Sequence, residues 1–415
     1  MSAAAPSWSQ VRLTGHAYPW DVLGDPDFVG RVLEHGLGEV TLACAYHAVR
    51  AATPLHPRHQ VVTAPTSALY RPVRTEAWAG HRLVPTPADW IGLPDPFGVA
   101  AGALRRAGIG VTAWIVLTHN SRLGQSRPDV AVVNCFGDSY PHALCPRWPE
   151  VRRYAATLAT EALRGADVTG VLLEAWGQHG LAHGSTHDKT AGAWSPAAIL
   201  LLSVCCCAAC QRAWTARGLD PGQVITDLRA AVRDQPPGDR PVETPDALLG
   251  SAVAAAIRAV RVEGAAGLLT EVLDALGDVA PGVPAAVFTD PDPWAAAPTS
   301  AVDARVSTAV VSAWSVNPGR EEALATARAA LPPEVTVGAY VTVLPPTDPE
   351  TVPTHVRRLV AAGAAQLNLY HLGLAGVDRQ QALGAAISAC RTAATAGRWR
   401  SGVNADRESR SLRRT

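Results

Sequence analysis

The stretch Val168-Thr-Gly-Val-Leu-Leu-Glu174 decides how we expect this chain to fold. It is short, mostly apolar and flanked by turn residues, so a buried strand fits it better than a helix. The strand would end on one carboxylate, at the edge of a sheet where α/β proteins gather their functional side chains. Glu174 is therefore a candidate catalytic group. The simpler interpretation is a solvated acid at the end of a strand.

Seven other segments share this short, apolar and β-branched character. With the first, the predicted strands are 11–17, 39–46, 110–118, 168–174, 283–289, 304–313, 335–343 and 365–371. Helical patterns between and after them fall at 94–107, 148–164, 198–217, 246–277, 320–331, 350–362 and 377–396. This alternation predicts an α/β protein with a (β/α)8 TIM barrel. A doubly wound open sheet is the alternative, but it usually has a glycine-rich turn after its first strand, and none is present.

The connections that follow the second, third and fourth strands are long, at about 47–93, 119–147 and 175–197. The returns from helix to strand are short, so the long loops gather at the C-terminal ends of the strands, where barrel enzymes build their sites. Residues 218–245 form a predicted insertion between helices of the fourth unit. We expect one barrel domain over 1–397 and a flexible, Arg-rich tail over 398–415.

Composition narrows the class of protein. Lys and Arg together number 36, as do Asp and Glu, so no nucleic-acid partner or acidic membrane surface is expected. We find no signal peptide at the N-terminus and no apolar stretch of the roughly 18–20 residues that a membrane span needs. Eight cysteines in a chain of this length do not resemble a secreted disulfide framework, which favours a reducing cytoplasm. The oligomeric state stays open.

Aromatic and polar side chains are predicted at or just beyond most strand ends. The candidates for substrate binding are Tyr46, His47, Asn120, Arg122, Trp176, Trp294, Trp314, Tyr340, Tyr370 and His371. Each alone could equally be a structural hydrogen-bond partner, but eight parallel strand ends surround one cavity. Aromatic faces stack on the C–H faces of sugars, and polar groups address hydroxyls, so we predict a small carbohydrate or oligosaccharide as substrate.

Cleavage of a glycosidic bond needs an acid and a second carboxylate. Glu174 is the predicted acid, because burial would raise its pKa. Asp290, at the end of the next strand, is the predicted partner, with Asp292 and Asp138 as alternatives. The run Asp290-Pro-Asp-Pro293 also fits a simple turn that ends a strand. His119 is a third catalytic candidate.

Two other functions stay open at this point. One is a barrel that binds sugars without hydrolysing them, because the sequence does not single out one residue as the second catalytic carboxylate. The other is a barrel lyase or isomerase that uses Glu174 with His119 or His371. No organic cofactor is expected for any of the three.

The run Cys205-Cys206-Cys207-Ala-Ala-Cys210 presents three thiols at spacings that suit a tetrahedral Zn²⁺. Cys145 or Cys135 could supply the fourth ligand, and such a closed site would be structural. The alternative is that these cysteines are small apolar residues on a buried helix. His179, His183 and His187 have the i, i+4 spacing of helical metal ligands, but glycines between them favour a loop.

Several motifs together resemble those of TIM-barrel glycoside hydrolases. They are Trp114…His119-Asn120, Asn134-Cys-Phe-Gly-Asp138…Cys145-Pro146, Gly170-Val-Leu-Leu-Glu174 and the cysteine run. The cysteine pattern is similar to the zinc cluster of family 42 β-galactosidases. That resemblance implies Cys145, Cys205, Cys207 and Cys210 as metal ligands and Glu174 as proton donor.

The chain departs from that family at two places. The family has Asn-Glu at the fourth strand, where this chain has Leu173-Glu174. Its nucleophile is a Glu at the end of strand seven. Here the seventh strand, from Val335 to Leu344, contains no Asp or Glu. The resemblance covers about residues 110–215 and implies the fold more directly than the activity.

Overall fold

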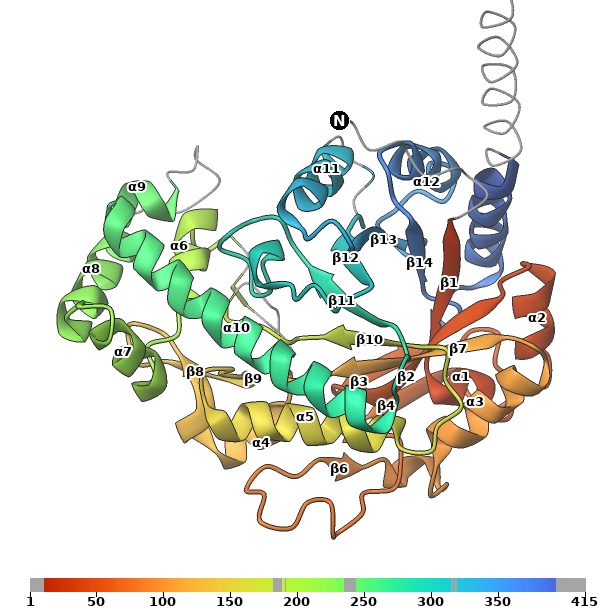
Figure 1. Ribbon diagram of the computed structural model, residues 1–415. Helices are drawn as coiled ribbons and strands as arrows, with labels where there is room; N and C mark the ends of the chain where they lie inside the picture. The colour runs from red at the N-terminus through yellow and green to blue at the C-terminus, as the bar shows by residue number, and fades with distance from the viewer. Residues whose placement is uncertain are drawn as a thin grey trace, which may run out of the picture.

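Eight parallel strands close into a barrel in the computed structural model, which describes residues 11–181, 189–190, 192–234, 244–314, 316 and 319–392 (Figure 1). Neighbouring strands follow the order β1-β14-β13-β12-β11-β10-β7-β2, and pairing of β1 with β2 closes the ring. The barrel strands are β1 (Arg12–Ala17), β2 (Glu39–Tyr46), β7 (Gly110–Val116), β10 (Gly170–Glu174), β11 (Ala285–Thr289), β12 (Thr308–Ser312), β13 (Thr336–Thr342) and β14 (Gln366–Tyr370). The predicted (β/α)8 barrel and all eight strands are confirmed.

These segments form strands because both of their faces are buried. Every residue of β2 is buried, and β7 is buried at all but its first residue. Parallel sheets covered on both faces need such continuous apolar runs, and β-branched side chains pack well on them. Alternate residues face the barrel interior, where His16 of β1 meets the ring of Trp114 at 4.6 Å and that of Tyr340 at 4.9 Å.

Helices cover the outside of the barrel. They are α1 (Pro19–Val22), α2 (Phe28–Glu34), α3 (Pro96–Arg106), α5 (Pro149–Leu163), α10 (Ser251–Val279), α11 (Arg320–Ala330) and α12 (Val352–Ala361), and residues 377–392 are also helical. Between β11 and β12 all residues are described, and the only helical turn there is η4 (Thr299–Ala301). The fifth unit therefore departs from the predicted alternation of strand and α-helix.

The second and third connections contain short elements of their own. After β2 these are β3 (Val49–Ala52), β4 (Val61–Ala64), β5 (Ala68–Leu69), β6 (Thr86–Pro87) and η2 (Asp89–Ile91). After β7 they are α4 (Ser121–Ser126), η3 (Pro128–Val130), β8 (Ala131–Val133) and β9 (Ser139–Leu144). Strand β5 pairs antiparallel with β2, which ties the second connection to the barrel wall.

The fourth unit carries the helical insertion that the sequence predicts. Its helices α6 (Pro196–Leu202), α7 (Ala208–Thr215), α8 (Pro221–Arg233) and α9 (Pro245–Leu249) gather at one side of the barrel (Figure 1). The prediction of one continuous helix over 198–217 is wrong. Residues 203–207, which include three of the cysteines, are not helical and separate α6 from α7. The predicted helix 246–277 is likewise divided, at Gly250, whose positive φ of 77° favours glycine. A separate apolar cluster, including Leu201, Trp214 and Ile257, fills this lobe.

The N-terminal end of the barrel is closed by polar side chains. Glu39 of β2 is buried there and accepts a hydrogen bond from Arg12 Nε at 2.6 Å. Thr112 of β7 donates to the same carboxylate. None of the helices in the described ranges is long and apolar enough to cross a membrane. The predicted tail 398–415, like His183 and His187, lies outside the described residues.

Candidate functional site

Glu174 faces the barrel interior at the C-terminal end of β10. The register pairs Leu172 with Trp114 of β7, and Glu174 lies two residues further along the same face. Trp114 Nε1 donates a hydrogen bond to Glu174 Oε2 at 2.6 Å. The predicted strand-end acid is thus held from a neighbouring strand by a single indole N–H.

Burial changes the acidity of this carboxyl. It raises the pKa of Glu174 from its ordinary value of 4.5 to about 7, and the hydrogen bond from Trp114 opposes this rise without cancelling it. At neutral pH a large fraction of the molecules therefore holds a proton on Glu174. A group with such a pKa can both donate and accept a proton near pH 7.

Tyrosine hydroxyls surround the acid. Burial raises the pKa of Tyr46, Tyr340 and Tyr370, and the negative charge of Glu174 adds to the rise for each. Ring contacts join these side chains to the rest of the interior, with Tyr46 at 4.5 Å from Trp114 and Tyr340 at 5.6 Å from Tyr370. The phenols stay neutral and can donate hydrogen bonds toward a ligand or toward the carboxylate.

A cavity of about 580 Å³ opens beside Glu174, at the C-terminal ends of β10, β11, β12 and β13. Five predicted site residues line it: Glu174, Asp290, Trp294, Trp314 and Tyr340. Its volume lies in the range of small-molecule sites, and its walls are largely aromatic and apolar. Trp314 is 41% exposed, an unusual position for a tryptophan that has no ligand to contact.

Asp290 is the second acid of the cavity. Among the lining residues that the structure describes, only Glu174 and Asp290 carry carboxylates. Leu173 pairs with Val287, so Asp290 lies two positions beyond the residue opposite Glu174. Strand geometry then puts the two Cα atoms roughly 8 Å apart.

Asp290 is also part of a turn, as the alternative interpretation predicts. Its Oδ1 accepts a hydrogen bond from the backbone N–H of Asp292 at 2.8 Å. Burial raises the pKa of Asp290 and the charge of Asp292 raises it further, against the opposing effects of that hydrogen bond and of Arg320. Among the described residues, none hydrogen-bonds to the other carboxylate oxygen, Oδ2.

The structure gathers other predicted residues beside this cavity rather than in its walls. The ring of His47 stacks on Tyr46 at 4.1 Å and on His119 at 4.6 Å. Asn120 caps α4, since its side chain accepts from Leu123 N at 3.1 Å. Its amide also donates to the Tyr154 hydroxyl. Arg122 donates to Thr86 Oγ1 at 3.0 Å.

Two other predicted residues are fully buried and do not line the cavity. Trp176 is fully buried and donates from Nε1 to the carbonyl of Phe288 at 2.7 Å. His371 is also fully buried, and its Nδ1 accepts from Gly373 N at 3.1 Å. Burial holds the pKa of His371 well below its ordinary value, so this ring is neutral. Neither lines the cavity.

Several residues in and near the site were missed by the sequence analysis. Phe288, Gln178 and Arg261 line the cavity. Arg261 could have been found, because it falls on the apolar stripe of α10 with Ile257, Gly264 and Leu268. A charged residue at such a position needs a buried partner.

Asp21 is a further buried acid that the sequence analysis did not single out. It accepts the backbone N–H of Tyr18 at 2.7 Å, and burial raises its pKa to about 7. It lies 3.8 Å from His371, behind the tyrosines, and is absent from the cavity lining described above. We therefore keep Asp290 as the candidate partner of Glu174.

Four cysteines form a compact site next to the cavity. The sulfurs of Cys145, Cys205, Cys207 and Cys210 all lie within 4.8 Å of one another, and all four residues are buried. Cys145 Sγ is 3.7 Å from Cys210 Sγ and 3.8 Å from Cys207 Sγ. A tetrahedral metal bound at about 2.3 Å from each sulfur places the sulfurs about 3.8 Å apart, so the donor set fits a metal ion.

The other nearby cysteines are excluded from this site. All eight cysteines are free thiols, so no disulfide accounts for the cluster. The thiol of Cys206 turns toward the carbonyl of Val204 instead. Cys145, rather than the alternative Cys135, is the fourth member of the group. Hydrogen bonds from the neighbouring thiols hold the pKa of Cys207 well below its ordinary range, which favours a thiolate there.

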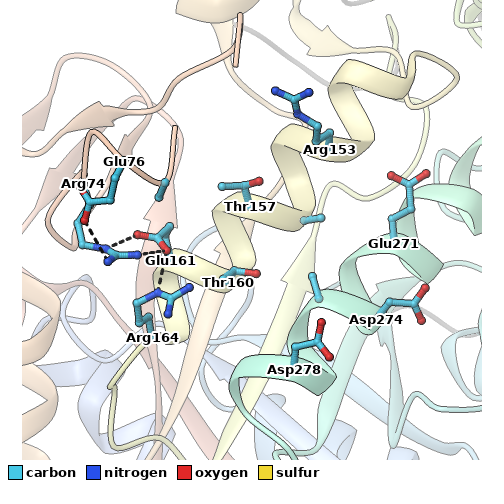
Figure 2. A pocket seen from close by; sticks show the side chains of 13 residues that line it. Arg74, Glu76, Arg153, Thr157, Thr160, Glu161, Arg164, Glu271, Asp274 and Asp278 are labelled. Carbon is cyan, nitrogen blue, oxygen red and sulfur yellow. Dashed lines mark hydrogen bonds and ion pairs between the residues drawn. The ribbon is translucent and has the colours of Figure 1, made fainter. Parts of the chain in front are cut away.

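A separate cavity of about 510 Å³ lies on the outer surface between α5 and α10 (Figure 2). Figure 2 shows Glu161 held between Arg74 and Arg164, each of which donates to its carboxylate. Burial alone would raise the pKa of Glu161, but these two hydrogen bonds outweigh it and lower the pKa. The most buried acid of this cavity, Glu161, is thus engaged in ion pairs with Arg74 and Arg164, and we assign no chemistry to the cavity.

Comparisons with protein-family models and with curated proteins find no match for this chain. Solved structures similar to it include α-L-fucosidase isoenzyme 2 from Paenibacillus thiaminolyticus, with a TM-score of 0.54 and 14% identity, covering 91% of this chain and 49% of that one. This chain thus spans about half the length of the fucosidase.

Two further structures are similar over most of this chain. The glycoside hydrolase domain of PgaB (BpsB) from Bordetella bronchiseptica has a TM-score of 0.54 and 15% identity, covering 91% of this chain and 99% of that one. Gan42B, a GH42 β-galactosidase, has a TM-score of 0.52 and 11% identity, covering 93% of this chain and 57% of that one. The likeness is one of fold. It confirms the predicted resemblance to TIM-barrel glycoside hydrolases at that level.

Proposed function

We propose that this chain is a glycoside hydrolase-like enzyme that acts on a carbohydrate or glycoconjugate, with Glu174 as general acid/base. The observation that carries this proposal is a carboxyl with a pKa of about 7 beside an aromatic cavity at the C-terminal strand ends. Protonated Glu174 would donate to the leaving oxygen. Trp314 and Tyr340 would offer their ring faces to the sugar, whereas the buried ring of Trp294 lies under the guanidinium of Arg258.

Asp290 is the proposed second carboxylate. Its position two residues beyond the level of Glu174 on the adjacent strand suits a pair that flanks one glycosidic bond, since such carboxyls lie about 5–9.5 Å apart. In this role its ionised form would activate water or attack the anomeric carbon. The Asp292 N–H that it accepts would favour that ionised form.

A barrel that binds sugars without hydrolysis is the second candidate. The same hydrogen bond from Asp292 supports it, because a carboxylate engaged in a turn can be purely structural. A lyase or isomerase that uses His119 or His371 is less favoured, since neither histidine lines the cavity.

Hydrolysis of glycosides with leaving groups of different acidity tests the proposal. A leaving group that is a good acid needs no proton, so Glu174→Gln should impair activated aryl glycosides little. Alkyl glycosides and oligosaccharides, which need the proton, should lose about 10²–10⁴-fold in rate. Glu34→Gln is the matched control, because Glu34 is exposed on α2 and is not in the cavity lining.

Each outcome of this experiment is informative. An equal loss across all leaving groups would remove Glu174 as the proton donor. Saturable sugar binding without any turnover in the wild type would favour the binding protein over the enzyme.

We further propose Zn²⁺ as the metal of the four cysteines, because an all-thiolate tetrahedral set is typical of structural zinc. We propose a reducing compartment, the cytoplasm, since all eight cysteines are free thiols. The division into a barrel domain over 1–397 and a flexible tail over 398–415 is likewise our proposal.

A further inference from the structure

Arg261 is a buried arginine whose contacts reach three segments of the cavity wall. It lies on α10 and is 4% exposed. Its Nη1 donates to Gln178 Oε1 at 2.6 Å and to the Ser203 carbonyl at 3.1 Å. Its Nη2 donates to the carbonyls of Trp294 at 3.0 Å and Ala295 at 3.2 Å. All four acceptors are uncharged, and all four residues line the cavity.

Gln178 continues this network from Arg261 to the cysteines. Its Nε2 lies 3.7 Å from Cys210 Sγ and 4.0 Å from Cys145 Sγ, in position to donate to both. Its Oε1 accepts the backbone N–H of Cys205 at 3.2 Å as well as the guanidinium of Arg261. Gln178 is 1% exposed, so no solvent competes for these bonds. One side chain therefore touches both the cavity wall and the four-cysteine site.

The charge of Arg261 has no carboxylate to balance it at ion-pair distance among the residues that the structure describes. A buried cation of this kind is costly unless an anion lies near. Burial lowers the pKa of Arg261, and the nearby groups that oppose this lowering are the sulfurs of Cys210, Cys205 and Cys145 and the carboxylate of Asp292. A divalent ion on four thiolates formally leaves two negative charges on the site, and the guanidinium offsets one of them.

We propose that Arg261 and Gln178 are positioning residues that make the geometry of the cavity wall depend on metal occupancy of the four-cysteine site. With the ion bound, the thiolates hold the Gln178 amide and balance Arg261, and Arg261 in turn fixes the carbonyls at 203, 294 and 295. Without the ion, the four sulfurs are no longer fixed and no longer hold the Gln178 amide in one place, so the segments 175–181 and 294–297 loosen. The inference rests on the proposed metal binding and is independent of glycoside hydrolysis.

The first test measures how firmly the purified full-length protein holds zinc. Transfer of the ion to a chromophoric chelator is followed for the wild type, Arg261→Met and Gln178→Leu. Loss of a group that hydrogen-bonds or balances metal ligands typically weakens binding 10–100-fold, and we expect this range for both variants. Arg217→Met is the matched control, because Arg217 also lies against α10 but pairs with a carboxylate, that of Glu263.

The second test uses the wild type alone, so it stands even where a variant does not fold. Hydrogen exchange is compared between zinc-loaded and chelator-stripped protein. We expect amides of 175–181 and 294–297 to exchange at least 10-fold faster after stripping, while those of β13 and β14 keep their rates.

Unchanged exchange in the two segments, firm zinc binding by both variants, or wild-type protein that binds no zinc would each overturn the inference. None of these readouts involves turnover. A failure here is therefore distinguishable from a failure of the proposed hydrolase activity.

Discussion

Replacing Glu174 by glutamine should stabilise the folded protein more in alkaline than in acidic solution. A carboxyl whose pKa is raised on folding binds its proton more tightly in the native state, so stability falls as pH rises from the unfolded pKa to the folded one. For Glu174 that window runs from 4.5 to about 7. Glutamine keeps the shape and the acceptor for Trp114 Nε1 and carries no charge.

The magnitude follows from the two pKa values. Linkage gives a destabilisation by ionised Glu174 of about 1 kcal/mol at pH 5 and about 3 kcal/mol at pH 8. The stability gained by Glu174→Gln should therefore be larger at pH 8 by about 2 kcal/mol. Asp21, whose pKa is also raised, titrates in both proteins and cancels from the difference.

Urea denaturation of the wild type and the variant at pH 5 and pH 8 measures this difference. Glu34→Gln, at an exposed position on α2, controls for the substitution itself. If Glu174→Gln changed stability equally at both pH values, the folded pKa of Glu174 would not be raised. The proton-donor argument would then lose its physical basis.

Three other substitutions test separate parts of the site. Trp314→Ala should raise KM about 2–10-fold, because the exposed ring would lose its stacking on the sugar, and should lower stability modestly, because the ring also contacts Tyr340 and Tyr370; an unchanged KM in steady-state assays would contradict this. Asp290→Asn should lower kcat by about 10²-fold or more with ligand affinity largely kept, as measured by calorimetry, and full activity would exclude it as the second carboxylate. Cys207→Ser should lose bound metal in elemental analysis and unfold at a lower temperature; retention of one ion per chain would contradict the four-thiolate site.

Much of the fold follows from local sequence because the barrel strands are buried on both faces. Such strands must be apolar along their whole length, and segments such as 39–46 or 110–116 have no other stable environment. Glu174 could be placed for the same reason, as the first ionisable residue after an apolar run. The spacing of the cysteines also predicted a metal site, although spacing alone could not decide whether Cys135 or Cys145 is the fourth ligand.

It was harder to predict which residues line the cavity. At a strand end, a shift of one position along the chain is enough to point a side chain in the opposite direction. Tyr370 joins the aromatic groups of the interior, whereas its neighbour His371 is buried beside Asp21. Trp176 follows Glu174 by two residues, yet the chain has already left the strand, since Ala175 has a φ of 54°. Alternation no longer applies beyond such a turn. The apolar stripe of α10 marks Arg261 as buried, but sequence could not identify its partners, which are the Gln178 side chain and backbone carbonyls from distant segments.

The closed N-terminal end of the barrel limits how a substrate can move. Arg12, Glu39 and Thr112 seal that end, and His16 and Trp114 fill the space between it and Glu174. A chain of sugars therefore cannot thread through the barrel axis. It must lie across the rim or enter with one end, and products must leave by the opening through which the substrate came. For a polymer that enters with one end, dissociation and re-entry, rather than sliding through the barrel, would separate one turnover of the proposed hydrolase from the next.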